Sequence, residues 1–151
     1  ALAFGLKCVA YDPMIKSASV DLGNASVAML PLDALLACSD AVTLHLPLLP
    51  ETRGLFSAEI LDKMKHGACL INTARGGIVD EKALAERLRS GRLGGAALDV
   101  FEKEPATDLS HFAGLTNLIA TPHIAGVTSE SNDRVSQMIA DEIIRFLGGS
   151  K

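Results

Sequence analysis

Three charged or titratable side chains recur at a fixed interval in the second half of the sequence. Arg75, Asp99 and His123 are 24 residues apart at each step, and Glu104 follows Asp99 in the segment FEKEP. An imidazole can give or take a proton near neutral pH, and a carboxylate beside it fixes its orientation. A guanidinium binds a carboxylate through two parallel hydrogen bonds. These residue types suit interconversion of a 2-hydroxy acid and a 2-keto acid, with a cofactor supplying the hydride.

Each of these side chains also has an ordinary structural interpretation. Arg75 could pair with a carboxylate such as Asp80, and Asp99 could cap a neighbouring helix. Glu104 could be a solvated loop residue, and His123, which follows a proline, could be a hydrogen-bonded structural imidazole. The set is more informative than any one member, because independent polar residues rarely fall at equivalent places by chance.

The segment NTARGG, residues 72–77, places Arg75 directly before Gly76 and Gly77. A guanidinium is costly to bury without a partner. Adjacent glycines are typical of a sharp turn or of a close approach by another group. Arg75 could therefore pair with a nearby carboxylate, or it could face a ligand cleft and an anionic substrate while the glycines let the chain turn away without side chains in that cleft.

The apolar pattern that positions these residues alternates between two kinds of segment. Short runs typical of strands cover residues 7–11, 27–30, 41–46, 68–73, 94–100 and 117–121. Helical spacing covers residues 31–38, 57–65, 80–90 and 128–147, with Ser57 as a predicted N-cap. This alternation predicts an α/β fold with a parallel sheet, and the near-continuous apolar strands predict burial on both faces.

In an open parallel sheet, ligands bind beyond the carboxyl ends of the strands. The polar residues that follow predicted strands are Asp12, His45, Arg75, Asp99 and His123. Glu104 lies in the loop after Asp99 and can reach the same edge. Asp12 precedes a proline and could instead serve only to form a turn.

The composition predicts a globular domain and excludes some partners. The chain has 151 residues, 48% of them hydrophobic, and a mean hydropathy of +0.28, which is enough for one domain with a core. The net charge of -4 and the pI of about 5.5 come without a basic stripe, so no nucleic acid partner is expected. No apolar run approaches the length of a membrane span, so no membrane partner is expected either.

The three cysteines, Cys8, Cys38 and Cys69, are odd in number and far apart. They are expected to be reduced, buried thiols of a cytoplasmic protein. Neither a CxxC pair nor zinc-ligand spacing is present, so no metal site is expected. His66, at a helix end, and His111, in a loop, are expected at the surface.

Three segments, NTARGGIVDEKAL, AALDVFEKEP and TPHIAG, resemble the D-isomer-specific 2-hydroxyacid dehydrogenases, most closely their phosphoglycerate dehydrogenase branch. The resemblance covers essentially the whole chain. It implies a Rossmann-type doubly wound parallel sheet, NAD as the cofactor, and a small 2-hydroxy or 2-keto acid such as 3-phosphoglycerate or hydroxypyruvate as the substrate. It also implies that Arg75 binds the substrate carboxylate and that Glu104 and His123 move the proton.

The same resemblance implies which residues contact the cofactor. Asp12 would accept hydrogen bonds from the adenosine ribose, and Asp99 would hold the nicotinamide carboxamide. The other implied NAD contacts are His45, Leu46, Pro47, Thr73, Ala74, Arg75, His123, Ala125 and Gly126. A carboxylate at Asp12 repels a 2′-phosphate, which favours NAD over NADP, although Lys16 lies close by in the sequence.

The chain departs from the family pattern near its start. The glycine fingerprint GxGxxG, expected about 20 residues before Asp12, is not in the sequence. The resemblance therefore implies that residues 1–151 are a partial NAD-binding domain, truncated at its N-terminus, without the first strand of the sheet and without the substrate domain. The strands near residues 7 and 41 would then lack the strand that lies between them in the doubly wound order.

Three functional interpretations remain open from the sequence. The chain could be the catalytic half of an NAD-dependent 2-hydroxyacid dehydrogenase, an NAD-sensing module of the corepressor type, or an inactive fragment. Corepressor relatives can retain the same Arg, Glu and His, so these residues do not separate the first two interpretations. Turnover of 2-keto acids with NADH by the complete protein would distinguish the first interpretation from the second. The resemblance further implies a homodimer formed through this domain.

Overall fold

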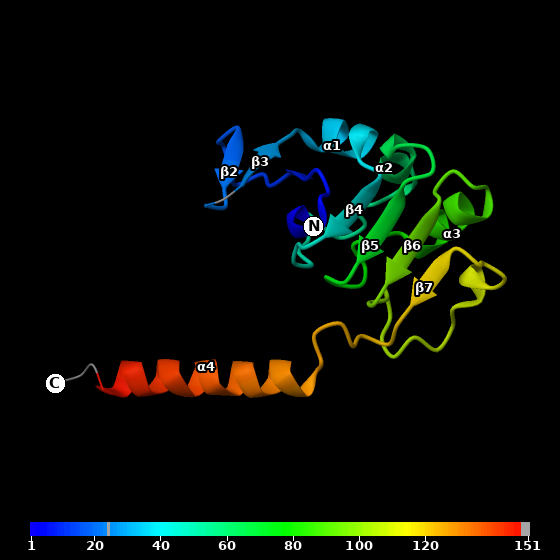
Figure 1. The fold of residues 1–151 in the computed structure, drawn as a ribbon. Helices are drawn as coiled ribbons and strands as arrows, with labels where there is room; N and C mark the ends of the chain where they lie inside the picture. Colours follow the sequence, from blue (N-terminus) through cyan, green and yellow to red (C-terminus); the bar gives the residue numbers. More distant parts are fainter. Residues whose placement is uncertain (24, 149–151) are drawn as a thin grey trace.

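The computed structural model describes residues 1–23 and 25–148, which form two sheets and their connecting helices (Figure 1). The larger sheet has four parallel strands in the order β4 (Ala41–Leu44), β5 (Cys69–Asn72), β6 (Gly95–Leu98) and β7 (Leu118–Ala120). The helices that precede or connect these strands are α1 (Leu32–Cys38), α2 (Ala58–Lys63) and α3 (Glu81–Arg89). The predicted α/β class with a parallel, Rossmann-like sheet is confirmed.

The smaller sheet has the order β1-β3-β2. Its strands are β1 (Val9–Ala10), β2 (Ser19–Asp21) and β3 (Ser26–Met29), with β1 parallel and β2 antiparallel to β3. The sequence did not predict β2, because this three-residue strand carries no apolar run. Within the described residues, β1 and β4 belong to separate sheets and do not pair with each other.

The strands of the larger sheet are paired so that they end at similar levels. Asn72, the last residue of β5, pairs with Leu98, the last residue of β6, and Leu98 pairs with Ala120, the last residue of β7. The segments that follow these strands therefore leave the sheet at one edge. This common edge is where the predicted site residues are found.

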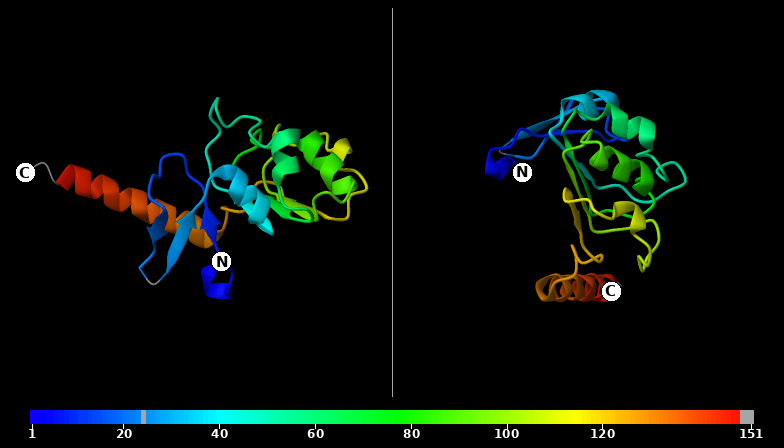
Figure 2. Two further views of the ribbon diagram at one scale, coloured as in Figure 1. Left: turned by 90° about the horizontal axis from the view of Figure 1, so that it is seen from above. Right: turned by 90° about the vertical axis from the view of Figure 1, so that its right-hand side faces the viewer.

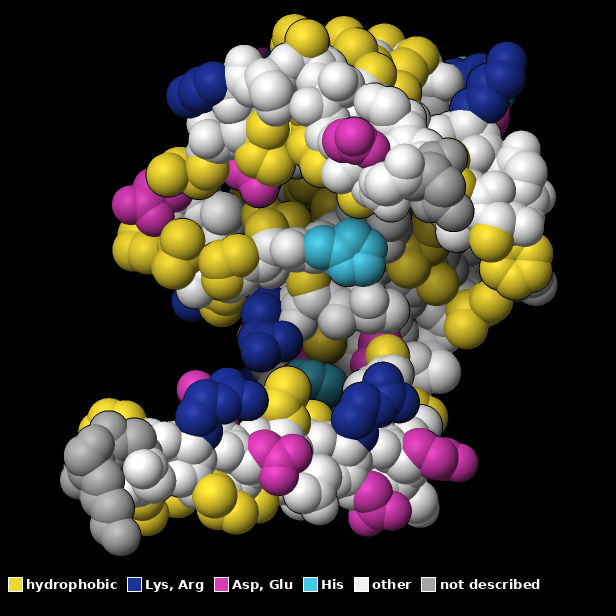
Figure 3. Space-filling view, turned by 60° about the vertical axis from the view of Figure 1, so that its left-hand side comes forward, with side chains coloured by type: hydrophobic (Ala, Val, Ile, Leu, Met, Phe, Trp, Pro, Cys, Tyr) yellow, Lys and Arg dark blue, Asp and Glu magenta, His cyan; other side chains and the backbone are white. Residues whose placement is uncertain are grey.

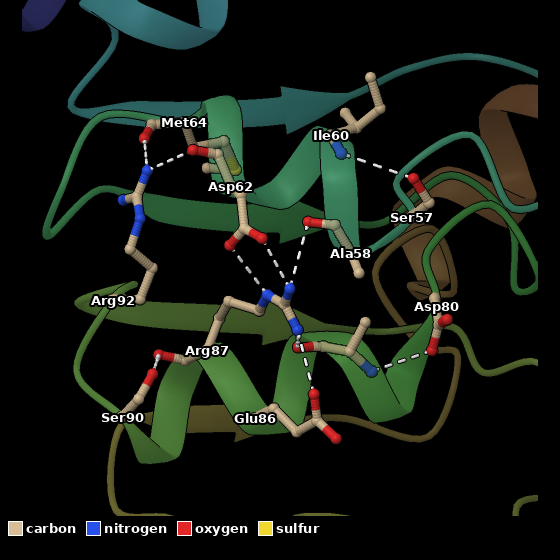
Figure 4. Close-up of polar contacts among 11 residues, drawn as sticks. Ser57, Ala58, Ile60, Asp62, Met64, Asp80, Glu86, Arg87, Ser90 and Arg92 are labelled. Carbon is tan, nitrogen blue, oxygen red and sulfur yellow. Dashed lines mark hydrogen bonds and ion pairs between the residues drawn. The ribbon is translucent and has the colours of Figure 1, made fainter.

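Local sequence signals explain where the helices begin and how they are held together. Ser57 caps α2, as predicted, by accepting a hydrogen bond from the Ile60 N–H. Arg87 on α3 forms two hydrogen bonds with the Asp62 carboxylate on α2, at 3.0 and 2.7 Å (Figure 4). Such a two-point contact has the geometry that favours arginine over lysine. It fixes α2 beside α3.

Helices α1, α2 and α3 cover one face of the larger sheet (Figure 2). Burial along the strands alternates accordingly: on β4, Val42 and Leu44 are buried, while Ala41 and Thr43 are exposed. The prediction of strands buried on both faces is therefore wrong for the part of the chain that the structure describes. The second face carries mainly small side chains, which also look apolar in the sequence.

The cysteines also differ from their predicted environment. All three are free thiols, as expected, but Cys38 and Cys69 are exposed and Cys8 is only partly buried. Cys69 is the first residue of β5 and lies in an exposed position of the alternating pattern. An odd, dispersed set of cysteines predicts the absence of disulfides more securely than it predicts burial.

Helix α4 (Ser129–Gly148) extends away from the two sheets (Figures 1 and 2). Its predicted apolar side, formed by Val135, Met138, Ile139, Ile143 and Phe146, is between 45% and 80% exposed. No side chain of this helix is buried. Among the described helices, none has both the length and the apolar character needed to cross a membrane.

Candidate active site

The predicted site residues stand at the carboxyl ends of their strands. His45, Leu46 and Pro47 follow β4, Thr73, Ala74 and Arg75 follow β5, Asp99 follows β6, and His123, Ala125 and Gly126 follow β7. Asp12 follows β1 and thus belongs to the smaller sheet. The topology therefore places all the predicted residues except Asp12 and Glu104 at one edge of the larger sheet, and Glu104 reaches that edge from its loop.

Glu104 and His123 form a direct pair across that edge. The Glu104 Oε2 atom lies 2.7 Å from His123 Nδ1, and the two side chains are 35% and 49% exposed. A carboxylate can only accept, so Nδ1 carries the proton in this contact and Nε2 is left as the reactive ring nitrogen. The alternative interpretation of Glu104 as a merely solvated loop residue is thereby wrong.

The pair keeps Glu104 ionised. The hydrogen bond from His123, followed by one from the Phe101 N–H to Oε1 at 3.0 Å, lowers the pKa of Glu104 below its ordinary value. Partial burial acts in the opposite direction but is the smaller effect. An ionised Glu104 accepts the Nδ1 proton of His123 and so leaves Nε2 as the ring nitrogen that can exchange a proton with a ligand oxygen.

Asp99 anchors the loop that carries His123. Its Oδ1 atom accepts hydrogen bonds from the Thr121 hydroxyl at 2.5 Å and the Ile124 N–H at 2.9 Å, and Oδ2 accepts one from the Ala125 N–H at 2.8 Å. The residue is 3% exposed. Burial alone would raise the pKa of Asp99, but these three hydrogen bonds, with the charge of His123, lower it overall.

This anchoring explains how His123 holds an uncommon backbone conformation. Its φ of 57° is in the left-handed region, which costs a residue with a Cβ some free energy unless the surroundings hold it. Asp99 binds the residues on both sides of His123. The sequence placed Asp99 at this edge but did not show that both carboxylate oxygens are taken up by the loop, and its contact with a nicotinamide carboxamide stays a prediction.

Arg75 is exposed at the end of β5 and makes no ion pair with another described residue. Its Nη1 atom donates to the neighbouring Ala74 carbonyl at 2.6 Å. The alternative partner Asp80 instead caps α3, where it accepts a hydrogen bond from the Ala83 N–H at 2.9 Å. The guanidinium therefore retains donors for an anionic ligand.

The turn after β5 is shaped by residues that the sequence only partly revealed. Asn72, 2% exposed, accepts a hydrogen bond from the Ala74 N–H and donates one to the Arg75 carbonyl, both at 3.0 Å. A Cβ at Gly76 would lie 1.7 Å from the Phe101 carbonyl oxygen. The close approach predicted for the glycine pair is thus made by the protein backbone. Asn72 was not among the residues predicted from the sequence. The signal for it was a polar residue directly after an apolar run, where a buried side chain needs hydrogen-bond partners.

His45 contacts its own strand end, with Nε2 3.0 Å from the Thr43 hydroxyl. The Pro47 carbonyl accepts a hydrogen bond from the Thr52 hydroxyl at 2.7 Å, which fixes the turn after β4. His45 is exposed and Leu46 is half-buried. These residues form one margin of the sheet edge.

Two cavities border the predicted residues. One, of about 660 Å³, is lined by Phe101, Glu104, Leu109, Thr121 and His123 among others. The second, of about 440 Å³, surrounds Asp12 and Lys16. In the space-filling view, a hollow separates helix α4, at the bottom, from the rest of the protein above it (Figure 3). Charged and histidine side chains surround this hollow.

Asp12 combines the turn-forming and ligand-facing interpretations. Its Oδ1 atom accepts a hydrogen bond from the Met14 N–H at 2.8 Å, so it does stabilise the turn after β1. The residue remains exposed and lines the second cavity. Lys16 in the same cavity donates to the Pro13 carbonyl at 2.7 Å. The Lys16 ammonium is therefore already engaged by the backbone.

His111 is not the surface residue that the sequence predicted. Its side chain is 21% exposed, and its Nε2 atom lies 3.2 Å from the Glu81 carboxylate at the start of α3. The short 3₁₀ helix Ser110–Phe112 packs against α3 and carries His111 inward. His66, in contrast, is exposed as predicted.

Residues 1–125 match the family model described as D-isomer specific 2-hydroxyacid dehydrogenase, NAD binding domain. A (S)-sulfolactate dehydrogenase from Chromohalobacter salexigens is 51% identical over 148 residues, which are 98% of this chain and 48% of that protein. A hydroxypyruvate reductase from Thermotoga maritima is 44% identical over 98% of this chain and 47% of its own length. The chain spans about half the length of these curated relatives.

A solved structure shares both the fold and the sequence pattern. The D-lactate dehydrogenase from Aquifex aeolicus, in complex with NAD and lactic acid, superposes with a TM-score of 0.80 and 34% identity. The match covers 98% of this chain and 45% of that chain. The similarity therefore extends over both sheets and the segments that carry the candidate site.

Proposed function

Because the chain belongs to the D-isomer specific 2-hydroxyacid dehydrogenases, through their NAD-binding domain, we propose that the complete protein transfers a hydride between NAD(H) and a small 2-hydroxy or 2-keto acid. The observation that carries this proposal is the Glu104–His123 pair at 2.7 Å. It lies at the sheet edge at which Arg75 also follows a strand. The similarity to dehydrogenases of sulfolactate and lactate supports the same substrate class.

In this proposal His123 moves the proton that accompanies the hydride. With Nδ1–H donating to Glu104, Nε2 gives a proton to the oxygen of a 2-keto acid and takes it back in the reverse reaction. Glu104 stabilises the imidazolium while it exists. Asp99 keeps the loop in place while His123 changes its charge.

Arg75 binds the carboxylate that is common to all 2-hydroxy and 2-keto acids. Its planar guanidinium presents parallel donors that match a carboxylate. Since Nη1 is tied to the Ala74 carbonyl, the guanidinium is partly oriented before the substrate arrives. A fixed guanidinium costs less conformational entropy when it binds.

The cofactor supplies the hydride when it is bound. Its adenosine ribose would be held by Asp12 in the 440 Å³ cavity. A carboxylate there can accept hydrogen bonds from the two hydroxyls of that ribose, whereas it repels a 2′-phosphate. Asp99 would contact the nicotinamide carboxamide. The remaining predicted contacts are His45, Leu46, Pro47, Thr73, Ala74, Arg75, His123, Ala125 and Gly126. We propose NAD over NADP, since the exposed carboxylate of Asp12 would repel a 2′-phosphate.

The proposal extends to the organisation of the complete protein. Residues 1–151 would be a partial NAD-binding domain, and a separate substrate domain would form the opposite wall of the cleft. A homodimer would form through this domain. The exposed apolar side of α4 is consistent with a further packing partner, and a monomer in light scattering would contradict the dimer.

The three free thiols are consistent with a cytoplasmic location.

The proposal is tested with the complete protein and a substrate panel. The panel comprises (S)-sulfolactate, glycerate, 3-phosphoglycerate and D-lactate with NAD, and hydroxypyruvate with NADH. We expect NAD-dependent turnover of at least one acid. NADH binding without any turnover would favour an NAD-sensing role, and absence of both would favour an inactive chain.

Arg75→Ala tests the assignment of the carboxylate site. Loss of two hydrogen bonds to charged groups costs about 3–6 kcal/mol, so kcat/KM should fall roughly 10²- to 10⁴-fold. Lys65→Ala is the matched control. Lys65 precedes β5 and forms an ion pair with Asp40, which precedes β4, so both lie at the opposite edge of the sheet. Near-normal kinetics of Arg75→Ala would sink the assignment.

A further inference from the structure

Glu81, the first residue of α3, carries a buried carboxylate that the proposed reaction does not use. The residue is 8% exposed. Its Oε1 atom accepts a hydrogen bond from the Glu102 N–H, and its Oε2 atom lies 3.2 Å from His111 Nε2. The side chain therefore links the start of one helix to a loop 21 residues further along the chain.

The loop that Glu81 contacts, residues 101–105, is the one that carries Glu104. We refer to it as the FEKEP loop. Its first N–H, from Phe101, donates to Glu104 Oε1 at 3.0 Å. Its second N–H, from Glu102, donates to Glu81. Gly76 lies directly against the same backbone, with space for no Cβ. The backbone that precedes Glu104 is thus held by Gly76 on one side and by Glu81 on another.

The surroundings of Glu81 stabilise its side chain in this buried position. A buried charge is costly unless it has partners. Here the Glu102 N–H and the His111 ring supply them, and the first turn of a helix favours negative charge. His111 is itself fixed, since Arg89 donates to its carbonyl at 2.9 Å and its ring packs at a tilt against that of Phe112, with the centroids 4.2 Å apart. The carboxylate therefore has a defined position from which to hold the loop.

We propose that Glu81 is a positioning residue that holds the FEKEP loop through the Glu102 N–H and so aims Glu104 at His123. The inference rests on the proposed dehydrogenase function. Glu81 touches neither His123 nor Arg75 in the structure, and it acts through the backbone of the loop. If the Glu102 N–H is released, Glu104 loses the fixed backbone from which it reaches Nδ1 of His123.

Two variants of the intact protein separate this role from a general need for negative charge. Glu81→Asp keeps the charge and the helix position but retracts the carboxylate from the Glu102 N–H by one methylene. Glu81→Gln keeps the reach and an acceptor oxygen but removes the charge. Glu86→Gln, on the exposed side of α3, is the matched control. The readouts are amide exchange of the FEKEP loop and the pH profile of kcat.

We expect Glu81→Asp to lose protection of the Glu102 amide and to lower kcat about tenfold or more, because small misplacement of a reacting group is costly. Its KM for NADH should change little. The acid limb of kcat should move to higher pH, because the hydrogen bond from His123 that lowers the pKa of Glu104 is weakened. Glu81→Gln should keep the amide protection and most of kcat.

The opposite pattern, with Glu81→Asp active and Glu81→Gln inactive, would overturn the proposal in favour of a charge effect on His111. Wild-type amide protection in Glu81→Asp would overturn it as well. If the wild-type protein turns over no acid in the panel, the proposed function fails, and the amide exchange still decides whether Glu81 holds the loop. If the wild-type protein turns over substrate and Glu81→Asp matches it, the inference about Glu81 alone fails.

Discussion

Replacement of Asp99 by asparagine should disable the site by releasing the loop that carries His123. The substitution preserves size and one acceptor oxygen, which can keep the contacts with the Thr121 hydroxyl and the Ile124 N–H. The new amide nitrogen then faces the Ala125 N–H, where a carboxylate oxygen accepted at 2.8 Å. Two donors in contact replace a charged hydrogen bond.

The magnitude follows from that single lost contact. A hydrogen bond to a charged group contributes about 1.5–3 kcal/mol, so the ordered loop should be destabilised by about 2 kcal/mol. His123 gains freedom to leave its left-handed conformation, which only the surrounding contacts hold. The equilibrium constant for the ordered loop then falls roughly 30-fold, and if turnover requires the ordered loop, kcat falls by up to that factor.

The assay is steady-state kcat for the best acid of the panel, together with the dissociation constant of NADH from fluorescence. Asp108→Asn is the control, since Asp108 is an exposed carboxylate that accepts from the Ser110 N–H in the neighbouring loop. We expect kcat to fall while the NADH constant changes less than about threefold. A weaker NADH affinity with unchanged kcat would instead support the predicted carboxamide contact and refute the reasoning from the loop.

Three further predictions follow from the same contacts. Gly76→Ala places a Cβ 1.7 Å from the Phe101 carbonyl oxygen, so the free energy of unfolding in urea should fall by about 1–3 kcal/mol or more; Gly126→Ala, where a Cβ has open space, should change it little, and equal effects would contradict the packing argument. The pKa of Asp99 is lowered in the folded protein. Its contribution to the free energy of unfolding is therefore present above the ordinary carboxylate range and is lost as the pH falls through the lowered pKa. The difference in unfolding free energy between wild type and Asp99→Asn should shrink on acidification, and a difference that stays constant would refute this. Asp12→Ser removes the charge that repels a 2′-phosphate, so the preference for NAD over NADP should narrow by about tenfold or more; an unchanged ratio of kcat/KM values would show that Asp12 does not face the ribose.

The sequence predicted the positions of the strand ends well because apolar runs are strong local signals. The register of β5, β6 and β7 then brings the following segments to one edge without further information. The Glu104–His123 contact could be expected only in outline. It depends on the path of a loop, and that path is set by contacts such as Glu81 with Glu102, which no local pattern reveals.

The failures have a common cause. Burial of a strand face depends on what packs against it, and an apolar sequence only permits that burial. The small side chains of the second face, such as Ala41 and Ala97, fit a covered sheet but do not show whether it is covered. The inward turn of His111 likewise depends on a partner far along the chain, Glu81 on α3. The short strand β2 depends on pairing with the next strand, β3, which its own sequence does not reveal.

The common level of the strand ends limits which insertions and deletions the protein can accept. Loops between a helix and the next strand, at the far edge, can change length without moving Arg75, Asp99 or His123. A single residue added within β6 would turn Asp99 to the opposite face of the sheet, because side chains alternate along a strand. It would then lose its contacts with the loop after β7. Natural length variation should therefore collect at the edge away from the site, and a tolerant position for a fused tag or a labelling peptide should be sought among the exposed residues there.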